Sequence, residues 1–184
     1  MSVSFPILNL FPSAPTAEIR RHTSARSCTM TAEISPHMER MLATPADAEI
    51  ILKLYQLRTE SVMRQARAWI GGEFWPTTIE EFNAVAENPA DPHNAWFRQV
   101  ITYWEMAAAM VLHGAVSAEL FVDSNGEGFF LLAKFAPILD AIREKNPYFM
   151  SKTTEMINRF SAAAQRYEVT LKRVEASRSA RRSK

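Results

Sequence analysis

The first helical pattern in the chain begins at Thr44. A threonine there can accept a hydrogen bond from an amide of the first turn, Pro45 suits the first helical position, and Asp47 favours the positive end of the helix dipole. Apolar residues then recur every three or four positions up to Ile70, and Gly71-Gly72 follows. The pattern predicts one amphipathic helix from residue 44 to about residue 70, with one buried face.

Two more helices are predicted before residue 115. Thr78-Ile79-Glu80-Glu81 has the spacing of a capping box, in which the glutamate bonds back to the cap amide, and Asn88-Pro89 ends this helix. Asp91-Pro92 begins a third helix that continues to His113. Because apolar residues cover both of its sides, we expect the third helix to lie at the centre of its domain.

Three further segments complete the helical pattern. Residues 117–122 fit one or two helical turns, and residues 123–128 fit a turn. A helix over residues 129–145 contains Pro137, which predicts a kink or a restart near Ala136. Asn146-Pro147 then begins one long C-terminal helix of roughly 25 to 30 residues, with apolar residues at alternate spacings of three and four. The residues of this stripe are Met150, Thr153, Ile157, Phe160, Ala164, Tyr167, Leu171 and Val174.

These elements predict an all-α fold, a bundle of five or six helices with a long heptad-patterned C-terminal helix. The five glycines leave little room for the tight turns of an all-β fold. We expect one domain over residues 38–175 and a frayed basic tail over 176–184. Residues 1–37 have no helical periodicity and are predicted to be a disordered arm, although a targeting segment or a start of translation at Met30 or Met38 would also fit.

Charge is distributed unevenly along the chain. Residues 38–171 contain 12 Lys and Arg against 17 Asp and Glu, whereas from Lys172 onward six basic residues stand against Glu175 alone. Such a tail can contact phosphates, but it has no aromatic residue that could stack on bases, and the body is acidic. Nucleic-acid binding is therefore not favoured.

The apolar stripe of the C-terminal helix could mediate contact with a partner. A repeat sustained over more than three heptads can pair with a second copy of itself or pack within its own bundle. Self-association through this helix is one prediction and packing in a monomer is the other. The candidate interface residues are Ile157, Phe160, Tyr167, Leu171 and Val174.

Several classes of chemistry have no support in the sequence. The four histidines form no pair with metal-ligand spacing, and neither a phosphate-binding glycine loop nor a nucleophile elbow occurs. We therefore predict no metal, no cofactor and no identifiable reaction. The single Cys28 favours a reducing compartment, most simply the cytoplasm, and the uncharged run 106–118 is too short to span a membrane.

Polar residues on otherwise apolar helix faces are the candidates for ligand binding. A buried charge needs a partner, so we expect Glu105 to pair with Arg58 or Arg98. With an imidazole nearby, such a group could hold an anionic ligand or perform acid–base work, or it could simply fix the register of packed helices. The candidate residues are Arg58, Arg98, Tyr103, Trp104, Glu105 and His113.

One resemblance adds to this reading. Tyr103-Trp104-Glu105, the run of small residues up to Gly114, and Phe135-x-Pro137-Ile138 before Arg143 resemble an uncharacterised bacterial family of small helical domains of unknown function, over about residues 95–157. Members often carry an N-terminal membrane helix that this sequence lacks, so the resemblance implies only a helical fold. The favoured function is a helical interaction or scaffold module, and the alternative is a binding protein or enzyme for a small anionic ligand.

Overall fold

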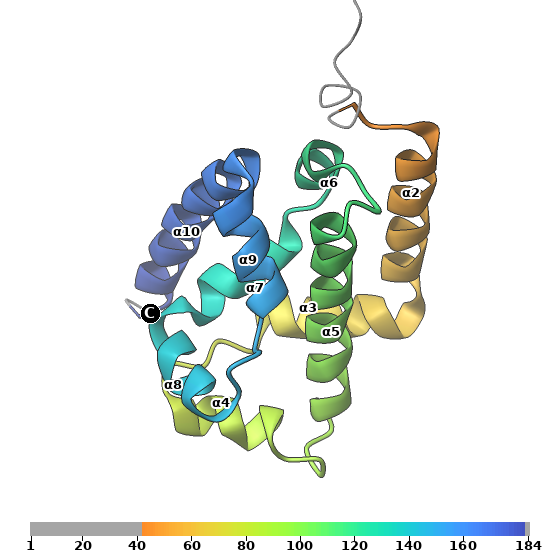
Figure 1. Cartoon of the computed structure of the whole chain (residues 1–184). Coiled ribbons are helices and arrows are strands. Elements are labelled where there is room, and N and C mark those ends of the chain that lie inside the picture. The colour runs from red at the N-terminus through yellow and green to blue at the C-terminus, as the bar shows by residue number, and fades with distance from the viewer. Residues whose placement is uncertain (1–41, 183–184) are drawn as a thin grey trace, which may run out of the picture. The chain divides into compact units, whose positions relative to one another are not determined.

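The helix α5 (Asn94–Leu112) lies at the centre of the computed structural model, which describes residues 42–182 (Figure 1). Ten of its residues are buried, from Asn94 near its start to Leu112 at its end. It packs most extensively against α3 (Ser61–Gly72) and α9 (Ser151–Arg159). The predicted central position of this helix is confirmed.

The described part of the chain contains nine α-helices and one 3₁₀ helix, and no strand. The all-α class and the long C-terminal helix are confirmed, but the number of helices exceeds the predicted five or six because three predicted helices are each divided into two, one of them at the expected restart near Ala136. The remaining elements are α2 (Pro45–Thr59), α4 (Ile79–Ala86), α6 (Ala118–Ser124), α7 (Glu127–Phe135), η1 (Ala136–Ile138), α8 (Leu139–Lys145) and α10 (Ser161–Arg182).

Each of the two unpredicted breaks occurs at one residue with an extended backbone. Glu60 has φ −58° and ψ 144° and separates α2 from α3, whereas Phe160 has φ −118° and ψ 120° and separates α9 from α10. Neither position contains the proline or glycine that marks a break in a sequence. By contrast, the predicted restart near Ala136 is present as η1, with Pro137 inside it.

The helix starts follow the predicted caps in part. The Thr44 side chain accepts from the Asp47 amide, and Asp47 in turn accepts from the Thr44 amide, so this capping box is complete. At α4 the Thr78 hydroxyl accepts from the Glu81 amide at 3.3 Å. The Glu81 carboxylate accepts mainly from the amide and hydroxyl of Thr77, the residue before the cap.

The C-terminal stripe packs inside its own domain, and its register differs from the prediction. Met150, Thr153 and Val174 of the predicted stripe are buried, but between them the buried residues are Met156 and Ala163, at 2% and 0% exposure, one position before the predicted Ile157 and Ala164. The candidate interface residues all lie on this packed side: Val174 is buried, and Ile157, Phe160, Tyr167 and Leu171 are half-buried.

An aromatic cluster fills the end of the core where α3, α4, α5, α7 and α9 approach one another. Its rings are Phe74, Phe82, Phe97, Phe135 and Phe149, and neighbouring centroids lie 5.3 to 6.4 Å apart. Most of these pairs meet edge to face or tilted, an arrangement that adds to the stabilisation from burial alone. The cluster thus packs together segments that are far apart in the sequence.

The two predicted terminal segments have different outcomes. The arm predicted over residues 1–37 lies outside the described residues. The tail from residue 176 was predicted to be frayed, but it continues α10 up to Arg182, and Arg178 and Arg181 bond to carbonyl oxygens of other segments. Among the described helices, none has the length and apolar character needed to cross a bilayer.

Candidate functional site

Arg58, one of the candidate ligand residues, reaches from the last turn of α2 to the start of α7. Its Nη2 lies 3.7 Å from Glu127 Oε2, and its Nη1 donates to Asn125 Oδ1 at 3.2 Å. Arg67 of α3 donates to the same Glu127 oxygen at 2.7 Å. The three charged side chains are only 17 to 24% exposed. Two arginines therefore share one carboxylate inside a partly buried cluster.

Trp104 and Tyr103 border this cluster. The Arg58 guanidinium lies 5.2 Å from the Trp104 ring centroid, and Tyr103 donates its hydroxyl to Leu54 O at 2.7 Å. Burial raises the pKa of Tyr103 to about 12, so its hydroxyl remains a donor at neutral pH. The space beside Trp104, Asn125 and the other residues around it measures only about 10 Å³, room for one water and no larger ligand.

Glu105 bonds to α9 and to neither of the two arginines expected as its partner. Its carboxylate accepts from the backbone amides of Lys152 and Thr153 at 2.9 Å each, and from the Thr153 hydroxyl at 2.7 Å. These groups belong to the first turn of α9, which has no side-chain cap of its own. The expected pairing with Arg58 or Arg98 is wrong, because Glu105 acts as the N-terminal cap of another helix.

The remaining two candidates lie on the surface. Arg98 is exposed on α5, and His113 is exposed at the C-cap of the same helix. The six candidate ligand residues are therefore divided: Arg58, Tyr103 and Trp104 lie together, whereas Glu105, Arg98 and His113 each face a different environment.

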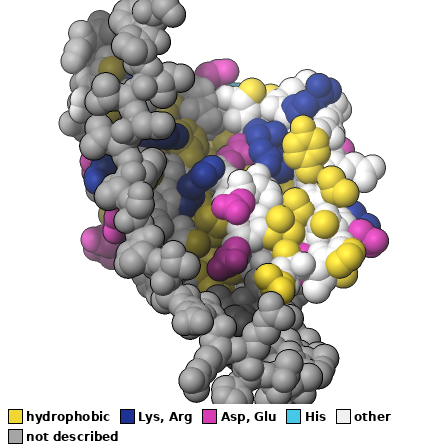
Figure 2. All heavy atoms as spheres, turned by 90° about the horizontal axis from the view of Figure 1, so that it is seen from above, with side chains coloured by type: hydrophobic (Ala, Val, Ile, Leu, Met, Phe, Trp, Pro, Cys, Tyr) yellow, Lys and Arg dark blue, Asp and Glu magenta, His cyan; other side chains and the backbone are white. Residues whose placement is uncertain are grey.

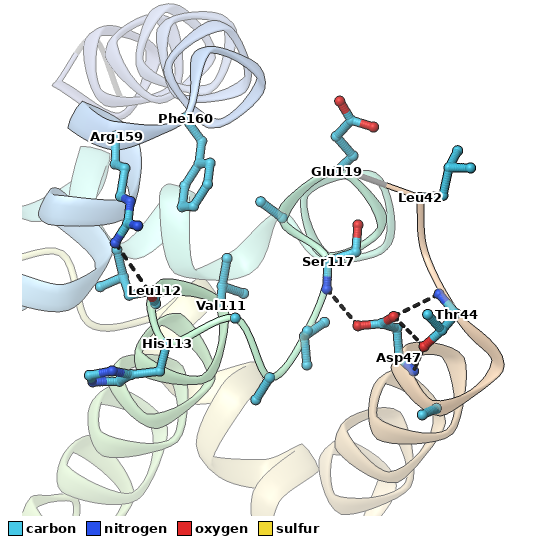
Figure 3. Close-up of a pocket in the computed structure, with 15 residues that line it drawn as sticks. Leu42, Thr44, Asp47, Val111, Leu112, His113, Ser117, Glu119, Arg159 and Phe160 are labelled. Carbon is cyan, nitrogen blue, oxygen red and sulfur yellow. Dashed lines mark hydrogen bonds between the residues drawn. The ribbon is translucent and has the colours of Figure 1, made fainter. Parts of the chain in front are cut away.

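An open cleft of about 750 Å³ lies at the end of the molecule where His113 is found (Figure 3). Its floor is the connection from α5 to α6, one wall is the start of α2, and the other wall is the junction of α9 and α10. A volume of this size is in the range of small-molecule and short-peptide sites. The lining is largely apolar, with Leu42, Val111, Leu112, Val116 and Phe160 among its residues. In the view from above, the described side chains on this face of the molecule include hydrophobic groups next to charged ones (Figure 2).

Asp47 ties two sides of this cleft together. Its Oδ1 accepts from the Ser117 amide at 2.7 Å, and its Oδ2 accepts from the Thr44 amide and hydroxyl. These hydrogen bonds, chiefly those from Thr44, lower the pKa of the Asp47 carboxyl. The residue thus joins the first turn of α2 to the N-cap of α6, as the dashed lines in Figure 3 show.

Arg159 supplies the positive charge on the opposite wall. Its Nη1 donates to Leu112 O at 3.1 Å, which caps the C-terminal end of α5, and its guanidinium lies 5.6 Å from the Phe160 ring centroid. A guanidinium carries five N–H donors in a planar fork, so one bond to a carbonyl leaves donors for a second acceptor. In Figure 3, Arg159 and Phe160 stand on one side of the cleft, and Glu119 stands on the other with its carboxylate pointing outward.

No group of three or more His, Cys, Asp or Glu side chains with the arrangement of a metal site occurs in the part of the chain that the structure describes.

Comparison with known proteins places the chain in a family. The model of the family described as a domain of unknown function, DUF4760, matches residues 43–160, more than half of the chain. The protein belongs to this DUF4760 family. The match confirms the resemblance inferred from the sequence. No curated protein and no solved structure matches the chain.

The match runs from the cap of α2 to Phe160, so the DUF4760 domain contains every residue that lines the cleft except Leu42. Asp47 is not recognisable from the sequence as a cleft residue, since it fits a simple helix cap. Arg159 is not recognisable either, because an arginine beside an apolar stripe is typical of a solvated helix face. No local signal marks either of them, as their partners are about 70 and 47 residues away along the chain.

Proposed function

We propose that this DUF4760 protein is a helical interaction module that binds an apolar carboxylate in the cleft beside Arg159. The observation that carries the proposal is the combination of a large apolar cleft with one guanidinium on its wall. Arg159 faces Phe160 and the C-terminal end of α5, and it has N–H groups beyond the one bonded to Leu112 O.

The apolar lining and the guanidinium select for different parts of one ligand. Val111, Leu112 and Phe160 would contact a hydrocarbon or aromatic body, and each buried methylene contributes about 0.8 kcal/mol. Arg159 would bind the carboxylate through a charge-assisted pair of hydrogen bonds. On the other wall, Asp47 already accepts three hydrogen bonds, so it is not available to a ligand as a free acceptor group.

Two kinds of molecule carry an apolar group next to a carboxylate and would fit this cleft. An apolar residue at the carboxyl terminus of a partner protein would make the protein an interaction module, which is the favoured function. A free organic acid would make it a small-molecule binding protein, which corresponds to the anionic-ligand alternative. The single cysteine supports placing the module in a reducing compartment, most simply the cytoplasm.

Isothermal titration with matched probes tests this proposal. Octanoate and a tetrapeptide ending in two leucines with a free carboxylate are compared with octanamide and the peptide amide. We expect at least one acid to bind, and its amide to bind at least about tenfold more weakly, since a charged hydrogen bond contributes about 1.5 to 3 kcal/mol. The peptide binding more tightly indicates the partner-protein source, and octanoate binding more tightly indicates the small-molecule source.

Two variants locate the site. Arg159→Gln is expected to abolish the difference between acid and amide, and Ala115→Trp, at an exposed position of the lining, is expected to block both. The control is Arg173→Gln, because Arg173 is exposed on α10 and does not line the cleft. Equal binding of acid and amide, or unchanged binding by Arg159→Gln, would overturn the proposal.

A further inference from the structure

Trp75, just after α3, is surrounded by three cationic side chains. Its Nε1 donates to Gly71 O at 3.2 Å, which fixes the ring against the end of the helix. Lys134 Nζ lies 4.2 Å from the ring centroid, and the guanidinium carbons of Arg181 and Arg178 lie 4.6 and 5.8 Å from it. The lysine comes from α7 inside the core and both arginines come from the end of α10.

Lys134 is the most deeply buried charged side chain among the described residues, at 0% exposure. Its Nζ donates to Ile70 O and lies 5.7 Å from the Phe130 ring centroid. The groups around the Lys134 amine are therefore the Ile70 carbonyl and the Trp75 ring from α3 and the segment after it, and the Phe130 ring from α7. From α10 come the two positive charges of Arg178 and Arg181. No carboxylate among the described residues lies within ion-pair distance of Lys134.

The end of α10 closes over this lysine through backbone carbonyls. Arg178 donates to the carbonyl oxygen of Lys134 itself and, at 3.5 Å, to Pro76 O. Arg181 donates to Gly72 O at 3.2 Å. These hydrogen bonds hold the last turns of α10 against the end of α3 and the segment that follows it. The two arginines of these turns thus bring positive charge close to the buried amine of Lys134.

We propose that the last two turns of α10 form a latch on Trp75, and that closing the latch is coupled to loss of a proton from Lys134. The closed arrangement excludes water from the amine and places two guanidinium groups beside it. Both effects oppose an ammonium ion there. Opening α10 would return the amine to water and separate the charges, so the open state holds the proton more firmly.

The direction of the pH dependence follows from this linkage. Burial first, and then the charges of Arg181 and Arg178, lower the pKa of Lys134 to about 7 from the ordinary value of 10.5. Between these values the open state binds more protons than the closed state. The equilibrium constant for opening should therefore fall by up to about tenfold for each pH unit above 7, and should level off below 7.

Limited proteolysis of the full chain measures this opening. Trypsin cleavage after Arg178 requires the latch to open, so its rate reports the open population. The rate is followed by mass spectrometry from pH 6.5 to 9.5 and divided by the rate for a free peptide of residues 172–184, which removes the pH dependence of trypsin. We expect this ratio to fall by up to about tenfold per unit above pH 7.

Lys134→Met keeps the apolar stem without a titrating group, and the ratio for this variant should be independent of pH. Lys53→Met, an exposed lysine on α2, is the control and should retain the wild-type slope. A flat ratio in the wild type, or an unchanged slope in Lys134→Met, would overturn the proposal. If Lys134→Met does not fold, NMR titration of Lys134 in the wild-type chain decides: a midpoint near 10.5 is incompatible with the latch.

Discussion

The carboxylate of Glu105 on α5 accepts hydrogen bonds from both the amide and the hydroxyl of Thr153 on α9, at 2.9 and 2.7 Å. Thr153 is 1% exposed. Met150, at the N-cap position of α9, has a left-handed backbone with φ 50°. The central helix thus supplies the cap for a helix that begins without one. Glu105 fixes where α9 starts, which is a structural role.

Replacing this cap should destabilise the fold. Glu105→Gln keeps the shape but loses the charge, so we expect a loss of about 1 to 2 kcal/mol in the free energy of unfolding, measured by urea denaturation. Glu168→Gln is the matched control, because Glu168 is exposed on α10. A change in Glu105→Gln no larger than in this control would contradict the capping role.

The second prediction concerns the Glu127 carboxylate, which Arg58 and Arg67 share. Glu127→Gln leaves Arg58 and Arg67 partly buried without their common anion, and we expect a loss of about 1 to 3 kcal/mol. Glu87→Gln removes an exposed ion pair, since Lys145 and Glu87 are 62% and 51% exposed, and it should cost at most about 0.5 kcal/mol. Chemical denaturation of both variants gives the comparison, and equal losses would show that burial of the cluster has no effect.

Two glycines should respond differently to alanine. Gly114 has φ +72°, which L side chains rarely adopt, so Gly114→Ala should cost about 1 kcal/mol even though the space around it is open. Gly72 also has open space but no positive φ, and Gly72→Ala should be neutral or slightly stabilising. Thermal melting of the pair tests this, and a larger loss at Gly72 would be inconsistent with the described backbone.

The buried Tyr103 should limit stability in alkali. Its folded pKa is raised to about 12 while the unfolded value is 10, so its contribution is complete below pH 10 and is lost as the pH rises toward 12. Tyr103→Phe should lose about 1 kcal/mol at pH 7, because the bond to Leu54 O is removed. Its stability should also fall less steeply than that of the wild type between pH 10 and 12. Parallel curves in urea titrations at these pH values would refute the assignment.

Self-association through the C-terminal helix and packing of this helix in a monomer both stay predictions. Its apolar stripe lies against the domain, and α10 packs on α6, α7 and α9. A dimer through these residues would have to expose them first, so we expect the mass measured by sedimentation at two concentrations to be that of the monomer. A mass that rises with concentration, and that falls again in Leu171→Glu, would instead support pairing through the stripe.

Local signals located some of the helix starts. Thr44 and Thr78 begin helices where their hydroxyls can cap, and Pro137 lies where the chain restarts. Such features depend on a few neighbouring residues, so the sequence contains them directly. The breaks at Glu60 and Phe160 have no such local cause. There a single extended residue turns the chain, and what stabilises the turn is the packing of the helices on either side.

The sequence by itself determined that this chain is helical, that α5 is central and that Thr44 and Thr78 cap helices, since apolar period and capping chemistry are local. The tertiary structure alone decided the partners of the polar residues: Glu105 with Thr153, Arg58 with Glu127, and Asp47 with Ser117. It also decided that Lys134 is buried and that Arg159 borders a cleft. The physical reason is that charge pairing and burial depend on distances across the fold, which spacing along the chain does not set.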